Sequence, residues 1–293
     1  MEIERFGECR AQLGESPRWD AAGGRLWVMD CRAGRIMSLD GVTGAVLTSF
    51  DVPAPSGCFA LTEDGRVVVA LKEAVVAVSV AGQGMVELGR IGDSHPNLRL
   101  NDGAAMPDGS FVVGTMHVFR EPGEAPLGGL YRLAPEGGFE RIGTGIGVTN
   151  GPCVSPVNGR FHVCDSAARV IWSHAVGPGF ELSGPQVFAE TAALDSAPDG
   201  CCFDAEGGLW TALVHAGAVV RYDTSGRVSH RIALPVAHPA GVCFGGSEMD
   251  EIFVTSISDS GRLRAEGPLD GAVLRVRGSG FTGAPVPRAR IAA

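Results

Sequence analysis

The feature that most constrains this chain is a unit of 41–50 residues that occurs six times. Each unit contains a turn signal followed by a run of β-branched or aromatic residues, as in residues 63–69, Glu-Asp-Gly-Arg-Val-Val-Val. Turn residues between β-rich runs are strong hairpin signals. The first strong strand residues of the units are Leu26, Val67, Phe111, Phe161, Leu209 and Ile252. This spacing predicts a repeat architecture.

Each unit has room for four short strands. An earlier strand opens with a residue followed by glycine, as in Asn150-Gly151, and two more candidate strands follow each turn. In the first unit these are Arg35–Leu39 and Ala45–Phe50. Six units of four antiparallel strands predict an all-β, six-bladed β-propeller that forms a single domain over residues 1–293.

Closure of the ring is the next requirement, because an open ring would leave strand edges bare. The segment Ile3–Cys9 precedes the first unit and has strand character. We expect it to close the last blade by pairing with strands at Gly241–Phe244, Ile252–Ser256 and Ala272–Val276. The Pro- and Arg-rich tail, about residues 285–293, is expected to be loosely ordered.

Charge and hydropathy exclude several classes of protein. The chain has 24 Lys and Arg against 33 Asp and Glu, a net charge of −9, whereas contact with nucleic-acid phosphates relies on basic residues. No apolar run approaches the roughly 18–20 residues that span a bilayer, and the start of the chain lacks the features of a signal peptide. We expect a soluble, cytoplasmic protein, a monomer or weak homo-oligomer, that binds neither nucleic acid nor membrane.

Cysteine and histidine give weaker signals. The eight cysteines form no pairs with zinc-site spacing, and several lie in apolar runs, so we interpret them as small buried side chains. His162 lies inside a predicted strand, which favours a structural role. His238, directly before a predicted first strand, can reach the mouth of the channel.

Oxygen-bearing side chains recur at one place in the repeat. Because the first strand of each blade starts at the same mouth of the channel, Asp102, Asn150 and Asp199 should gather there, with Glu15 in the first unit. Turn chemistry alone accounts for any one of them. Several in register, with no sulfur, predict a site for a hard or borderline divalent cation.

Long loops should lie over the same mouth. They are the inter-blade loop at residues 93–98 and the segments His117–Gly129 and Ser258–Asp270. The first of these leads to Arg99, a donor for hydroxyl or carbonyl oxygens of a ligand. An ion pair or a solvated charge is the alternative interpretation of Arg99.

Five short motifs carry a family resemblance in their order and spacing. They are Gly14-Glu15-Ser16-Pro17, Arg99-Leu100-Asn101-Asp102-Gly103, Gly114-Thr115-Met116, Thr149-Asn150-Gly151-Pro152 and Pro198-Asp199-Gly200. Over about residues 5–277 the chain resembles the SMP-30/gluconolactonase (regucalcin-like) family, of the bacterial sugar lactonase type. The resemblance implies a six-bladed propeller that binds one divalent metal ion.

The resemblance also implies roles for residues. The metal ligands fall on Glu15, Asn150 and Asp199, with Ca²⁺ the first expectation, and Zn²⁺, Mn²⁺, Mg²⁺ or Fe²⁺ also compatible. Arg99 and Asn101 match substrate-contacting positions, and Asp102 lies beside them as a supporting residue. The loop around His95 and the segment His117–Gly129 depart from the family pattern, which leaves the sugar and its ring size open.

The expected reaction is hydrolysis of an aldonolactone to its aldonic acid. The metal would polarise the lactone carbonyl and acidify a water, with Asp199 as general base. One alternative is an arylesterase or organophosphate-type hydrolase on the same ring of ligands. Another is a propeller that binds a metal or ligand without catalysis, because fold does not fix function.

Overall fold

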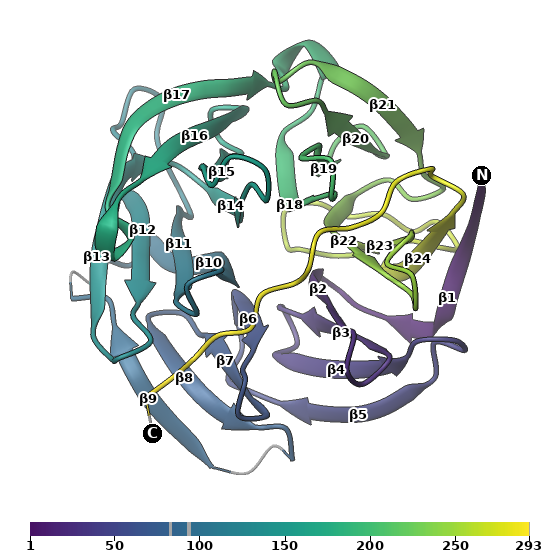
Figure 1. Ribbon diagram of the computed structural model, residues 1–293, viewed down its shortest axis with the longest axis horizontal. Helices are drawn as coiled ribbons and strands as arrows, with labels where there is room; N and C mark the ends of the chain where they lie inside the picture. The colour runs from purple at the N-terminus through teal and green to yellow at the C-terminus, as the bar shows by residue number, and fades with distance from the viewer. Residues whose placement is uncertain (82–83, 93–94, 293) are drawn as a thin grey trace.

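The computed structural model describes residues 1–81, 84–92 and 95–292. Their strands form six four-stranded antiparallel sheets around a central channel (Figure 1). This confirms the all-β, six-bladed propeller. Helical structure is confined to two 3-10 turns, η1 (Pro178–Phe180) and η2 (Ala192–Leu194), among the residues described. In this part of the chain no helix has the length and apolar character needed to cross a membrane.

The blades follow one another along the chain, with the first strand of each beside the channel (Figure 1). Blade 1 is β2 (Gly14–Asp20), β3 (Arg25–Asp30), β4 (Arg35–Asp40) and β5 (Val46–Asp51). Blade 2 is β6 (Cys58–Leu61), β7 (Arg66–Ala70), β8 (Ala74–Ser79) and β9 (Met85–Arg90). Blade 3 is β10 (Leu98–Ala105), β11 (Phe111–His117), β12 (Gly128–Leu133) and β13 (Phe139–Ile146).

The second half of the ring repeats the pattern. Blade 4 is β14 (Thr149–Val154), β15 (Phe161–Asp165), β16 (Val170–Val176) and β17 (Leu182–Glu190). Blade 5 is β18 (Pro198–Phe203), β19 (Leu209–Leu213), β20 (Ala218–Tyr222) and β21 (Val228–Ala233). Blade 6 is β22 (Pro239–Gly245), β23 (Glu251–Ser256), β24 (Ala272–Arg277) and, from the start of the chain, β1 (Glu2–Arg10).

The run Val67-Val68-Val69 shows why the blades stack. All three side chains are fully buried, and successive side chains of a strand point to opposite faces of its sheet. Val67 and Val69 pack with Trp27 of blade 1, whereas Val68 packs with Phe111 of blade 3. A sheet buried on both faces needs a continuous apolar run rather than an alternating one.

Ring closure occurs as expected from the sequence. β1 runs antiparallel to β24, with Ile3 opposite Val276. Phe6 is buried in this sheet, its ring centroid 4.9 Å from that of Phe253 and 4.8 Å from the guanidinium carbon of Arg275. Both ends of the chain therefore contribute to one blade, and β1 pairs with the edge of β24 that faces away from β23.

The C-terminal tail crosses the end of the channel toward which the first strands run (yellow in Figure 1). The backbone N–H of Ala289 donates to the Leu61 carbonyl (2.8 Å), and the N–H of Glu63 donates to the Ala289 carbonyl (3.0 Å). The Arg288 guanidinium pairs with Asp20. The expectation of a loose tail is not met by residues 284–290, because these bonds and the complete burial of Ala289 hold them in place.

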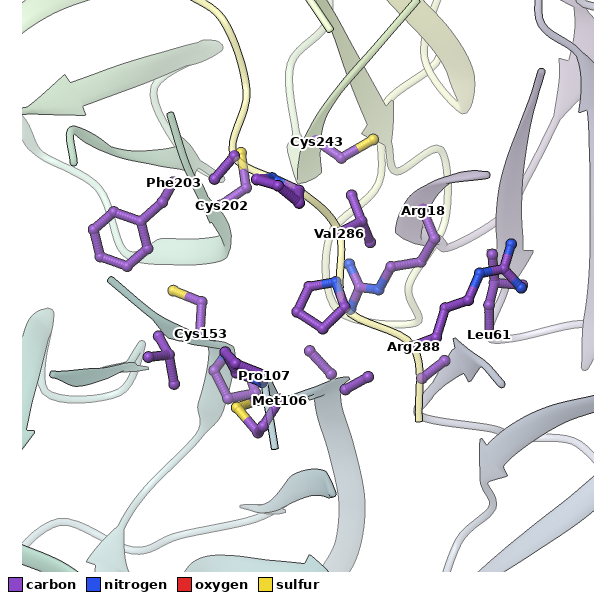
Figure 2. Close-up of a pocket in the computed structure, with 18 of the residues that line it drawn as sticks. Arg18, Leu61, Met106, Pro107, Cys153, Cys202, Phe203, Cys243, Val286 and Arg288 are labelled. Carbon is purple, nitrogen blue, oxygen red and sulfur yellow. The ribbon is translucent and has the colours of Figure 1, made fainter. Parts of the chain in front are cut away.

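A cavity of about 680 Å³ lies between this tail and the ends of the first strands. Figure 2 shows the thiols of Cys153, Cys202 and Cys243 around it, with Arg18 and Val286. The cysteines are free thiols, as the sequence predicts. The cavity thus occupies the opposite end of the channel from the residues expected to bind metal.

The closing strand makes a stability prediction. Replacing Phe6→Ala should lower the free energy of unfolding by about 3–5 kcal/mol, because a buried ring is lost from the junction. Urea denaturation measures the change. Phe119→Ala is the matched control, since Phe119 is 66% exposed and should change stability by about 0.5 kcal/mol or less. Equal losses in the two variants would contradict a special role for the junction.

Candidate metal and substrate site

The first strands share an irregularity that shapes the mouth of the channel. Five of the six lose regular pairing with the second strand at the same point, and blade 2 does not. The irregular steps are Glu15 to Arg18, Leu100 to Gly103, Asn150 to Cys153, Pro198 to Cys201 and Pro239 to Val242. A bulge bends a strand and changes the direction of its side chains. The bulges therefore fall at the residues predicted to bind metal and substrate.

Two aspartates fix the strands that carry Glu15 and Asn150. The Asp30 carboxylate accepts the backbone N–H groups of Gln12 and Leu13, directly before β2. The Asp165 carboxylate accepts those of Gly147 and Val148, directly before β14. Each aspartate ends the second strand of its own blade. The same kind of contact thus positions the strands that carry Glu15 and Asn150.

Glu15 and Asp199 place two carboxylates in the channel. Burial raises the pKa of Glu15 well above its usual range, the charges of Asp199 and Asp102 add to this rise, and Arg99 and Arg18 oppose it. Burial also raises the pKa of Asp199, with a further rise from Asp102. Oδ1 of Asp199 is buried without a hydrogen-bond partner. A buried carboxylate oxygen without a partner lowers the stability of the folded state unless a proton or a cation binds to it.

Asn150 lies in a chain of hydrogen bonds across three blades. Nδ2 of Asn101 donates to Oδ1 of Asn150 (3.0 Å), and Nδ2 of Asn150 donates to Oγ of Ser166 (2.8 Å). Ser166 in turn donates to the carbonyl of Pro198 (2.6 Å), the residue before Asp199. An amide oxygen has two lone pairs, so Oδ1 of Asn150 keeps one for a further ligand.

Asp102 is held by the backbone. Its Oδ1 accepts the N–H of Gly103 (2.8 Å), and its Oδ2 accepts the N–H of Gly151 (2.7 Å) in the next blade. Gly151 has a φ of +55°, which glycine adopts readily. The Asp102 carboxylate is therefore engaged in joining blades 3 and 4, beside Asn101 and Asn150.

Arg99 keeps most of its donors free of hydrogen bonds to the described residues. One Nη donates to the Leu100 carbonyl (2.9 Å), whereas a guanidinium has five N–H groups. Burial lowers the pKa of Arg99, and the charge of Glu15 raises it, which places the two groups within electrostatic reach of each other. Of the loop at residues 93–98, positions 93 and 94 lie outside the described residues.

His162 and His238 lie where the sequence predicts. His162 is buried between the rings of Phe188 and Phe203, and burial lowers its pKa to about 4. His238 lies at the start of β22, with Nδ1 2.8 Å from the Val214 carbonyl. His162 is thus a structural residue, and His238 lies at the mouth.

Glu15, Asn150 and Asp199 form a donor set that fits a divalent cation. The set contains only oxygen, and the unpartnered Oδ1 of Asp199 lacks a positive charge or donor to satisfy it. Among the described residues no three His, Cys, Asp or Glu side chains lie together as a complete metal site. In the set predicted from the sequence, the amide oxygen of Asn150 is the third ligand.

Sequence reasoning missed Ser166, Asp30 and Asp165. A signal was available for the aspartates, because both follow a predicted second strand and precede a small turn with alanine. Ser166 carried no comparable signal, since its contact with Asn150 depends on how blade 4 meets blade 5.

Comparison with known proteins places this geometry in context. A sequence profile of the SMP-30/Gluconolactonase/LRE-like region matches residues 13–258. The chain is 30% identical to regucalcin of Gallus gallus over 292 residues, 97% of each chain. It is 31% identical to 6-deoxy-6-sulfogluconolactonase of Pseudomonas putida over 268 residues, 90% of this chain and 91% of that one. A solved luciferin-regenerating enzyme has the same fold, with a TM-score of 0.89 and 22% identity over 99% of both chains.

The buried carboxylates predict an unusual dependence of stability on pH. With raised pKa values, the folded chelator-treated protein keeps protons that the unfolded chain releases. Its stability should therefore fall as pH rises above about 4. Asp199→Asn should raise the melting temperature at pH 7 by a few degrees, and less as pH approaches 4. Thermal melts across pH, with and without added divalent ion, test this. A lower melting temperature in the chelated variant at pH 7 would contradict it.

Proposed function

Because the chain belongs to the SMP-30/gluconolactonase/LRE-like family, we propose that it hydrolyses a sugar lactone, an aldonolactone, to the aldonic acid with one divalent cation. The observation that carries the proposal is a pair of carboxylates, the half-buried Glu15 and the buried Asp199, that share the channel with the amide of Asn150. The Pseudomonas relative is named as a lactonase of a sulfonated gluconolactone, which supports a lactone as the substrate.

Glu15, Asn150 and Asp199 would hold the cation. Carboxylate and amide oxygens suit Ca²⁺ first, and Mg²⁺, Mn²⁺, Fe²⁺ and Zn²⁺ remain compatible with them. When bound, such an ion supplies Lewis-acid polarisation of a carbonyl and lowers the pKa of a water molecule.

Asp199 is the proposed general base. It accepts one proton from the attacking water as the new C–O bond forms at the lactone carbonyl carbon. The ring C–O bond then breaks, and the proton passes to the leaving alkoxide, which becomes a hydroxyl group of the aldonic acid. A carboxylate is a weak base, so this role requires an acidified water.

Arg99 and Asn101 are the proposed substrate contacts. Both contacts donated by Nδ2 of Asn101 are to protein, to the Thr149 carbonyl and to Asn150, which leaves its Oδ1 to accept a sugar hydroxyl. Arg99 has free N–H groups that donate to oxygen atoms of the sugar. Asp102, held by two backbone N–H groups, is the proposed supporting residue next to Asn101 in the chain.

Acid release from a panel of aldonolactones tests the function. Chelator-treated protein should be inactive, and one divalent ion should restore release above a no-enzyme blank, since these lactones open spontaneously. Turnover of an aryl ester or an organophosphate but of no lactone would favour the alternative of an arylesterase or organophosphate-type hydrolase. Folded protein that binds a divalent ion and hydrolyses none of these substrates would favour a binding propeller.

A second prediction concerns Asp199 itself. Asp199→Asn should lower kcat for the lactone by about 10²–10⁴-fold, the usual contribution of a general base, while the fold is kept. Asp195→Asn is the matched control, because Asp195 is an exposed residue of the same type four positions earlier, and it should retain activity. Unchanged kcat in Asp199→Asn with the ion bound would remove Asp199 from the mechanism.

A further inference from the structure

Two long loops from opposite sides of the ring meet over the mouth of the channel. One joins β11 to β12 in blade 3, and the other joins β23 to β24 in blade 6. The guanidinium carbon of Arg262 lies 5.0 Å from the ring centroid of Phe119. In a ring of six, blades 3 and 6 face each other. The contact between Arg262 and Phe119 therefore spans the channel axis.

This bridge is attached to the candidate substrate site. Nδ2 of Asn97 donates to the Phe119 carbonyl (3.3 Å), and Asn97 lies two residues before Arg99. The start of β10, which carries Arg99, pairs with the end of β11, with Leu98 opposite His117. The loop with Phe119 continues from that strand end. Arg262 is consequently brought to the same mouth as Arg99.

The cation of Arg262 has no carboxylate partner among the described residues. Arg264, on the same loop, pairs with Asp259 (3.6 Å), which also pairs with Arg32 (3.4 Å). Glu124 of the facing loop lies 3.8 Å from Nε2 of His117. These pairs join other charged groups of the two loops, and none of them includes Arg262.

Arg262 and Arg99 act on each other as like charges. Burial is the main cause that lowers the pKa of Arg99, and the charge of Arg262 acts in the same direction. Glu15 offsets part of this repulsion from the floor of the site. Two guanidinium groups near one space favour an anion between them, and their planar forks match carboxylate, sulfonate and phosphate groups.

We propose that Arg262 and Arg99 bind an anionic substituent of the lactone, at the end of the sugar remote from the ester. This inference rests on the proposed function, because the ester end is assigned to Glu15, Asn150 and Asp199. The substituent is a carboxylate, sulfonate or phosphate on a sugar lactone, and the Arg262–Phe119 bridge closes over it.

Matched pairs of substrates test the proposal. D-glucaro-1,4-lactone carries a carboxylate where D-glucono-1,4-lactone has a hydroxymethyl group, and 6-phospho-D-glucono-1,5-lactone is paired with its neutral parent. The protein with its ion restored should show a kcat/KM at least about tenfold higher for an anionic member than for its neutral partner, the size of one charge-assisted hydrogen bond. The pair with the larger ratio of kcat/KM, anionic over neutral, shows whether the site prefers a carboxylate or a phosphate.

Arg262→Gln should lower the ratio of kcat/KM, anionic over neutral lactone, by about tenfold. Most of the change should come from a higher KM for the anionic lactone, while kcat/KM for the neutral lactone stays unchanged. Arg264→Gln is the matched control, because Arg264 lies on the same loop and already has a carboxylate partner. Its ratio should stay at the wild-type value. Equal kcat/KM for both members of each pair in the wild type, or equal effects of the two substitutions, would overturn the proposal.

A binding measurement separates this proposal from the proposed function. Calorimetry compares D-glucarate with D-gluconate, which differ by the same carboxylate, in wild type, Arg262→Gln and Arg264→Gln at one metal concentration. Tighter binding of glucarate that is lost only in Arg262→Gln supports the anion site, even if no lactone is hydrolysed. Binding of glucarate that is unaffected by Arg262→Gln overturns it, even if a neutral lactone is a good substrate.

Discussion

Pairing between β1 and β24 is the constraint on which the rest of the structure depends. The six first strands face a common channel only because the ring is closed, and the last blade is complete only because the start of the chain joins it. Glu15 lies on β2, directly after the closing strand, whereas Asp199 lies on β18, in blade 5. Closure brings these carboxylates into one site although 184 positions separate them.

Without a bound cation, the two carboxylates of the site lower the stability of the folded state. The carboxylates of Glu15 and Asp199 repel each other and lose hydration. The surrounding structure fixes the position of the site. Asp30 and Asp165 hold the residues before β2 and β14. Asn101 and Ser166 orient the amide of Asn150. On the proposed function, a cation bound there would remove the penalty. Affinity for an ion and instability of the ion-free ring would then be two consequences of one arrangement.

The repeat was sufficient to predict the fold from the sequence, because hairpin signals at 41–50-residue spacing admit few other architectures. The position of Glu15, Asn150 and Asp199 at one mouth followed from strand direction alone. Contacts between blades were not accessible in the same way. The Ser166–Asn150 bond, the place of Ala289 against Leu61 and the Arg262–Phe119 bridge each join segments whose sequences carry no mutual signal.

The two ends of the channel are not equivalent, and this bears on how a ligand reaches the ring. The tail and the 680 Å³ cavity occupy one end. A small void of about 10 Å³ lies beside Glu15, and it shares Pro17 and Arg18 with the lining of that cavity. Such a space holds about one water molecule and does not pass a sugar. On the proposed function, a lactone therefore enters from the mouth that the Arg262–Phe119 contact spans.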